Sequence, residues 1–302
     1  MENRNFQNIL WELLRMIAAF AVAVLAACLV MNRMIEISGI RETQAFSGEL
    51  SARIRAVEDN MENLREEFLH SEGNQQTTGM YETLRGKKIV YDGDSIAVSK
   101  DSNGGGYPAL IAELTGGTYV NCAKGGARLC SFSGKHSVVD NLVNLPTDGD
   151  LYCFEGGIND YWANTPLGEV DPKDYSGEYD TETVCGALET IFSYCLEHYP
   201  GKPVCFVIAH KVKKTAAAPN ANGDTFEDYR NAMIRVCEKY SIPYYDAFSE
   251  SGLNGWNPTQ SERFMTGNSE NAPDGIHPNA EGYKRYYVPQ LIDLFQKLMP
   301  AE

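Results

Sequence analysis

From about residue 80 onward, short hydrophobic runs alternate with longer segments in which hydrophobic residues recur every three or four positions. The short runs predict β-strands over residues 88–91, 119–123, 151–155, 203–209 and 243–247. The longer segments predict helices that include residues 107–114, 181–198, 225–240 and 280–298. Strands that alternate with helices favour a parallel sheet with helices on both faces. The pattern therefore predicts an α/β fold, a three-layer α/β/α sandwich with a parallel, flavodoxin-like sheet.

The beginning of the chain has another pattern, with an uncharged apolar run of 16 residues from Met16 to Met31. As a helix, this run would span roughly 24 Å, so it needs apolar residues before it to cross a hydrocarbon core of about 30 Å. We expect residues 1–34 to be a single-pass transmembrane signal anchor in the cell membrane, with the rest of the chain outside the cell. A cleaved secretory signal and a lipoprotein anchor on Cys28 are the alternatives.

A heptad pattern follows the apolar run. Its hydrophobic positions, spaced alternately by four and three, are Leu50, Ile54, Val57, Met61, Leu64 and Phe68. The pattern predicts a helical stalk over residues 35–69, which either forms a short parallel coiled coil, and so a homo-oligomer, or packs back on the globular part. Residues 70–80 are polar and aperiodic, so we expect a linker there and a globular domain over 81–302.

Composition and charge exclude several classes of protein. The chain of 302 residues is 43% hydrophobic and 22% charged, which is ordinary for a folded protein. Its net charge of −15 argues against nucleic acid as a partner, because such partners require clustered Lys and Arg. The 8 cysteines include no C-x-x-C pair, so neither a disulfide framework nor a zinc site is expected.

Several polar residues are expected at one edge of the sheet, because the carboxyl ends of parallel strands meet there. Ser95, Gly126 and Asn159 follow the first three predicted strands, and Asp274 and His277 precede the last predicted helix. A histidine can deprotonate a serine nucleophile, and an aspartate can orient the imidazole. The backbone N–H groups of Ser95 and Gly126 and the amide of Asn159 can donate to an oxyanion. These residue types predict a hydrolase of acyl groups.

The same segments resemble the four sequence blocks of the SGNH (GDSL-type) hydrolases, a serine esterase family. The matching blocks are Gly93-Asp94-Ser95, Gly126, Gly157 to Asp160, and Asp274 to His277. The resemblance spans about residues 88–280. It implies that Ser95 is the nucleophile of a triad with His277 and Asp274, that Ser95, Gly126 and Asn159 form the oxyanion hole, and that no metal or organic cofactor takes part.

Two positions qualify this resemblance. Ala97 stands where the family usually has a small hydroxyl residue two positions after the serine, so we do not expect the supporting hydrogen bond of that hydroxyl. Gly125 is an alternative to Gly126 as the glycine of the second block. We favour Gly126 because it lies five residues after Asn121.

The substrate is less closely defined by the sequence. Tyr161 and Trp162 directly follow Asn159-Asp160, so they are candidates for the wall of an acyl or sugar pocket, with core packing as the alternative. His210 follows the fourth predicted strand and is a candidate lining residue. We expect a short acyl group, such as acetyl, on a glycan, for example an acetylated polysaccharide. Two other functions stay open: an acyltransferase that uses the same triad, and a non-catalytic glycan-binding surface protein.

Overall fold

The computed structural model describes residues 24, 27, 81–98, 106–132, 136–213, 217–266 and 273–299. The chain divides into two units, Met1–Thr78 and Gly79–Glu302. The predicted membrane anchor, stalk and linker lie outside the described residues, apart from the helical Val24 and Ala27. Within the described ranges, no helix combines the length and the hydropathy of a membrane span.

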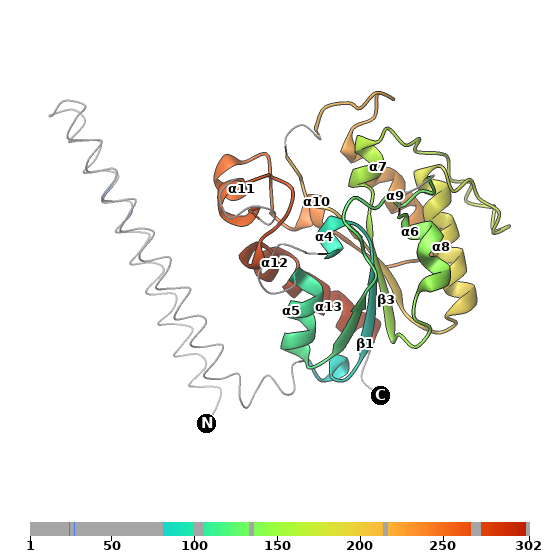
Figure 1. Ribbon diagram of the computed structural model, residues 1–302, viewed down its shortest axis with the longest axis horizontal. Helices are drawn as coiled ribbons and strands as arrows, with labels where there is room; N and C mark the ends of the chain where they lie inside the picture. The colour runs from blue at the N-terminus through green and yellow to red at the C-terminus, as the bar shows by residue number, and fades with distance from the viewer. Residues whose placement is uncertain are drawn as a thin grey trace. The chain divides into compact units, whose positions relative to one another are not determined.

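Five parallel strands form one sheet in the order β2-β1-β3-β4-β5 (Figure 1). In chain order the strands are β1 (Lys88–Asp92), β2 (Thr118–Asn121), β3 (Leu151–Gly156), β4 (Val204–Ile208) and β5 (Tyr244–Asp246). This strand order is that of flavodoxin-like sheets. Every residue of β3 and β4 is buried, which explains why these strands read as continuous apolar runs. The structure confirms the predicted parallel sheet.

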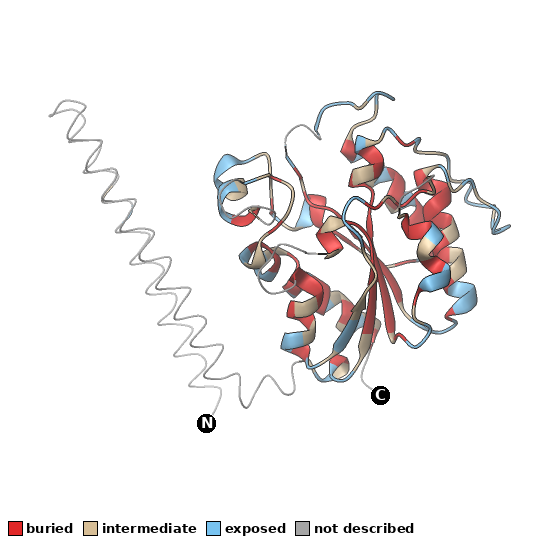
Figure 2. Ribbon diagram, viewed as in Figure 1, coloured by how far each residue is buried: buried red, intermediate tan, exposed pale blue. Residues whose placement is uncertain are grey.

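Helices cover both faces of the sheet (Figure 1). One group consists of α5 (Gly106–Thr115), α12 (Ala280–Tyr286) and α13 (Val288–Leu298), which contact one another. The other group consists of α6 (Val138–Asn141), α8 (Val184–His198) and α9 (Phe226–Tyr240). Buried residues gather along the strands and on the helix faces turned toward them (Figure 2). The hydrophobic core therefore fills the two spaces between the sheet and the helices that cover each of its faces.

Threonine caps determine where α8 and α9, the two longest helices of the described residues, begin. The Thr183 side chain accepts a hydrogen bond from the backbone N–H of Gly186 at the start of α8. Thr225 and Asp228 form a reciprocal capping box at the start of α9. Each cap satisfies backbone N–H groups that have no partner within the helix.

The prediction of one continuous helix over 280–298 is wrong. The chain forms α12 and α13, which are separated at Tyr287. Pro289 lies in the first turn of α13, where it has no N–H to donate and where its ring would clash with the preceding turn of a continuous helix. Hydrophobic periodicity continues across this break, so periodicity alone does not detect it.

Short elements complete the described part of the domain. They are η1 (Glu82–Leu84), α4 (Ser95–Val98), η2 (Leu142–Asn144), α7 (Ile158–Trp162), α10 (Ala247–Glu250) and α11 (Pro258–Phe264). Of these, α4 directly follows the turn after β1, and α7 directly follows the turn after β3. Both therefore begin at the carboxyl edge of the sheet, where the predicted site residues are found.

Candidate active site

Ser95 is the first residue of α4, in a turn that its neighbours constrain closely. The Asp94 carboxylate accepts a hydrogen bond from the backbone N–H of Ile96 (2.8 Å) and so holds the start of the helix. A Cβ at Gly93 would lie only 2.7 Å from the backbone oxygen of Glu155, so the turn requires glycine there. Ser95 itself is partly exposed.

The structure brings the three predicted triad residues together. The Nε2 atom of His277 lies 2.8 Å from the Ser95 Oγ, although the two residues are 182 positions apart. The Nδ1 atom of His277 lies 2.6 Å from the Asp274 Oδ2. The other carboxylate oxygen of Asp274 accepts the backbone N–H groups of Ile276 (2.8 Å) and His277 (2.9 Å). Asp274 thus orients both the imidazole and the turn that carries it.

Charge and hydrogen bonding agree with this arrangement. Partial burial alone would raise the pKa of Asp274, but hydrogen bonds from the His277 side chain and from the turn's backbone outweigh burial and lower it. Asp274 is therefore ionised at neutral pH and is an acceptor for the Nδ1–H of His277. In the neutral tautomer that carries its proton on Nδ1, Nε2 is the acceptor for the proton of the Ser95 hydroxyl.

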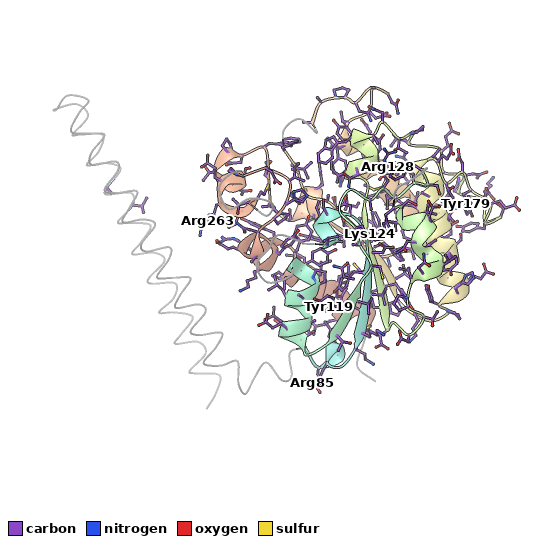
Figure 3. The ribbon with its side chains drawn as sticks, in the orientation of Figure 1. Arg85, Tyr119, Lys124, Arg128, Tyr179 and Arg263 are labelled. Atoms are coloured by element: carbon purple, nitrogen blue, oxygen red, sulfur yellow. The ribbon has the colours of Figure 1, made fainter. Side chains whose placement is uncertain are left out.

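The turn after β2 lies against residues 93–95, the turn that carries Ser95 and is called the serine turn below. Lys124, labelled in Figure 3, donates its backbone N–H to the Gly93 carbonyl (3.0 Å). A Cβ on Gly125 would lie 3.9 Å from the Ser95 Cβ. The Ala127 N–H closes the turn on the Lys124 carbonyl (3.0 Å), and Gly126, at its third position, has φ +78°. This left-handed conformation favours glycine. Gly126 is exposed, and its role as an oxyanion donor stays a prediction.

Asn159 links the serine turn to the turn after β2. It lies in α7, and its Nδ2 donates to the Asp94 Oδ2 (3.1 Å) and to the Ala127 carbonyl (3.0 Å). Both amide hydrogens therefore have protein acceptors in this structure. An oxyanion can accept a hydrogen bond from this amide only if it displaces one of the two present acceptors. The sequence does not indicate this competition.

Two of the three predicted substrate contacts are buried, and the structure corrects them. Tyr161 is 4% exposed, packs edge-on against Phe226, and donates its hydroxyl to the Ala218 carbonyl (2.6 Å). His210 is 0% exposed, with its Nδ1 2.7 Å from the Tyr287 hydroxyl. Both side chains are buried in the fold, so neither is exposed to a substrate. Tyr161 packs in the core, which was the alternative to a substrate contact.

Trp162 is the predicted contact that reaches the surface. It is 38% exposed and ends α7, three residues after Asn159, so the two side chains lie on neighbouring positions of one helix face. The Lys213 ammonium lies 5.5 Å from the centre of its ring. A Cβ on Gly275 would lie 3.1 Å from the Lys213 Cβ, so this lysine also adjoins the turn between Asp274 and His277. Lys213 was not singled out from the sequence.

Asp160 has a structural function that the sequence analysis did not assign. It is fully buried, and its two carboxylate oxygens accept the backbone N–H groups of Leu129 (2.9 Å) and Cys130 (3.2 Å). Burial raises its pKa, and those hydrogen bonds oppose the rise. Asp160 therefore holds the segment that follows Gly126. The signal in the sequence is its place at the end of the third block, Gly157 to Asp160.

The position of Ala97 also becomes clear. The residue is fully buried, and its backbone carbonyl accepts the side-chain amide of Asn121 (2.8 Å). A backbone group therefore links this turn to the end of β2, with no hydroxyl at residue 97. Across the described residues, no group of three or more His, Cys, Asp or Glu side chains is placed to hold a metal ion.

Comparisons with known proteins agree with this geometry. The sequence profile of the GDSL-like lipase/acylhydrolase family matches residues 93–285. One solved structure is 26% identical with a TM-score of 0.61, covering 72% of this chain and 99% of its own. A protein from Lactobacillus plantarum is 21% identical with a TM-score of 0.60, covering 70% and 97%.

A possible lipase from Chitinophaga pinensis is 20% identical with a TM-score of 0.54, and the match covers 70% of this chain and 98% of the other. The last two structures share the fold with this chain. A search of the curated proteins found no relative.

We predict that Asp160→Asn weakens both stability and turnover. An amide offers only one acceptor for the two backbone N–H groups, so about 1–3 kcal/mol of unfolding free energy should be lost. Because the released segment adjoins Gly126, kcat should fall about 10-fold. Denaturant unfolding and ester hydrolysis measure both effects. Asp293→Asn, on the exposed face of α13, is the control. Unchanged kcat in Asp160→Asn would contradict this role.

We also predict acid destabilisation from His210. Burial, with a contribution from His277, lowers its pKa from 6.5 to about 3. Below about pH 6.5 the unfolded chain binds a proton that the folded chain excludes, so stability falls as the pH drops. The slope contributed by one such group approaches about 1.4 kcal/mol per pH unit.

Chemical unfolding of the wild type and His210→Asn at several pH values between 7 and 4 measures this contribution. The variant should lose less stability than the wild type over that range. His198→Asn, which alters an exposed histidine, should keep the wild-type slope. Equal slopes in the wild type and His210→Asn would show that His210 does not contribute.

Proposed function

We propose a mechanism on one premise: the chain belongs to the GDSL-like lipase/acylhydrolase family and is an enzyme that hydrolyses ester bonds. The observation that supports the mechanism is the continuous hydrogen-bonded line from Ser95 through His277 to Asp274, with separations of 2.8 and 2.6 Å. In this mechanism Ser95 is the nucleophile, His277 is the general base and then the general acid, and Asp274 holds the imidazole.

The reaction proceeds in two halves. The Ser95 Oγ attacks the ester carbonyl while His277 takes its proton, and the oxyanion is stabilised by the N–H groups of Ser95 and Gly126 and by the Asn159 amide. His277 then protonates the leaving alcohol, which departs and leaves an acyl-enzyme. Water, deprotonated by His277, attacks the acyl carbon and releases the acid and the free serine.

We propose a short acyl group, such as acetyl, carried by a glycan. Support comes from Trp162, whose ring is partly exposed one helical turn from Asn159. An exposed indole face suits stacking against the C–H face of a sugar. The Lys213 ammonium beside it can donate to sugar oxygens. Both residues come from segments that also carry or adjoin proposed catalytic groups.

The proposed location comes from the sequence. We propose that residues 1–34 anchor the protein in the cell membrane with the esterase domain outside the cell, where acetylated polysaccharide is accessible. The heptad pattern of the stalk supports a homo-oligomer. Protease protection of the full chain in sealed membrane vesicles would test the orientation.

The first prediction concerns the nucleophile and the acyl length. The full chain should hydrolyse p-nitrophenyl acetate faster than p-nitrophenyl octanoate, and Ser95→Ala should lower kcat on the order of 10⁴-fold. Ser176→Ala, in an exposed loop, is the matched control. Faster octanoate turnover would contradict the short acyl group. Retained turnover in Ser95→Ala would contradict the mechanism.

Two further outcomes identify the alternative functions. Product that appears only when a sugar acceptor is added would indicate an acyltransferase. Glycan binding that persists in Ser95→Ala, with no turnover by the wild type, would indicate a binding protein.

The second prediction concerns Trp162. Stacking of one ring contributes about 1 kcal/mol, so Trp162→Ala should raise KM for an acetylated oligosaccharide about 5- to 10-fold. KM for p-nitrophenyl acetate should be unchanged because this ester has no sugar. Tyr119→Ala on β2, with 41% exposure, is a control of similar exposure. A KM that changes equally for both esters would exclude a specific sugar contact.

A further inference from the structure

The carboxyl group of Glu155 lies against the serine turn, next to Asp94. Glu155 is on β3, and its Oε2 accepts the backbone N–H of Asp94 (3.2 Å). Both side chains are 0% exposed. A Cβ on Gly93 would lie 3.0 Å from the Glu155 Oε2, so the absence of a side chain at Gly93 lets the turn lie on this carboxyl group. Gly93, Asp94 and Glu155 together form this contact between the serine turn and β3.

Two ionised carboxylates this close would repel each other strongly in a buried site. Among the described residues, no Lys, Arg or His forms an ion pair with Asp94 or Glu155. Burial raises the pKa of Glu155 well above its usual value, and the neighbouring Asp94 charge raises it further. Burial also raises the pKa of Asp94, but hydrogen bonds from Glu155 and the Ile96 N–H oppose that rise. Of the two carboxyl groups, Glu155 therefore has the more strongly raised pKa.

The other side chains that interact with Glu155 do not supply a compensating charge. Three groups interact with Glu155: Tyr107 of α5, Tyr287 between α12 and α13, and Cys153 of β3. Burial raises the pKa of each well above its usual value, so all three are neutral at neutral pH. On Asp94, His277 lowers the pKa and Asp160 raises it. Burial, followed by the neighbouring Asp94 charge, is therefore what favours the protonated form of Glu155 by raising its pKa.

Asp94 in turn connects Glu155 to the proposed oxyanion hole. Its Oδ2 accepts the Asn159 amide (3.1 Å), and its Oδ1 accepts the Ile96 N–H (2.8 Å) at the start of the serine helix. We propose that Glu155 is a positioning residue that stays protonated, bonds to Asp94, and through Asp94 holds the Asn159 amide in place for the oxyanion. This inference rests on the proposed function.

Loss of the Glu155 proton would place two negative charges side by side within the site. The repulsion would move Asp94 and, with it, Asn159 and the start of α4. A neutral side chain can replace protonated Glu155 if it both donates to the Asp94 carboxylate and accepts backbone N–H groups, as Glu155 does from Asp94 and Ala97. A glutamine has both a donor and an acceptor and cannot ionise. It therefore replaces the protonated form of Glu155 but not the charged form.

The test compares Glu155→Gln with Glu155→Leu in the full chain. Glu155→Gln should keep kcat for p-nitrophenyl acetate within about 3-fold of the wild type, whereas Glu155→Leu should lower kcat by about 10²-fold with KM little changed. The alkaline loss of kcat that follows Glu155 ionisation in the wild type should be absent in Glu155→Gln. Equal losses of kcat in the two variants, or the same alkaline limb in Glu155→Gln, would overturn the proposal.

Infrared difference spectroscopy provides a readout that does not depend on activity. The wild type at neutral pH should show the C=O stretch of a protonated carboxyl group, and Glu155→Gln should lose it. Glu189→Gln is the matched control, because Glu189 is a buried glutamate paired with Lys239 and should lose only carboxylate bands. A carboxylate band lost from Glu155→Gln would overturn the proposal even if Glu155→Leu does not fold.

The two proposals fail in different ways. A wild type without turnover on any ester, with the protonated band present, would count against the proposed function while the protonation of Glu155 stands. A wild type that is active and depends on Ser95, with no protonated band, would leave the function intact and overturn the assignment of Glu155.

Discussion

The pairing of β1 with β3 is the constraint on which the site depends. In the observed register Asp92 lies opposite Phe154, so the chain leaves the two strands side by side. The turn that carries Ser95 therefore meets the turn that leads into α7, and Asp94 contacts both Glu155 and Asn159. A shift of one residue would turn Glu155 to the opposite face of the sheet and separate these groups.

Buried carboxyl groups then hold the turns in place. Asp94 accepts a backbone N–H at the start of α4, Asp160 accepts two from the segment after Gly126, and Glu155 accepts the Asp94 N–H. Burying an acid opposes folding unless hydrogen bonds compensate for the lost water. Apolar residues of the same size would avoid this cost, but they offer no acceptor for a turn's N–H groups. The main contribution of these acids is therefore to hold the turns of the site in position, rather than to stabilise the fold. Such a compromise is common at functional sites.

Much of this arrangement could be predicted from the sequence, for identifiable physical reasons. Strands buried on both faces leave apolar runs, and a parallel sheet places their carboxyl ends at one edge. This is why Ser95 and His277 could be paired across the chain. The burial of Tyr161 and His210 could not be predicted, because sequence adjacency to a site residue does not determine which way a side chain points. The proton on Glu155 depends on the charge beside it, which only the fold brings there.

The two acceptors of the Asn159 amide differ in a way that matters for the proposed mechanism. One is the Asp94 carboxylate and the other is the neutral carbonyl of Ala127. A hydrogen bond to a charged acceptor is stronger than one to a neutral acceptor. An oxyanion would therefore displace the Ala127 carbonyl more readily than Asp94. The amide gains a second charged acceptor, in place of the neutral Ala127 carbonyl, only when the oxyanion forms, so the exchange stabilises the transition state more than the bound ester. The bond to Asp94 persists throughout and keeps the amide aligned while its other hydrogen changes partner.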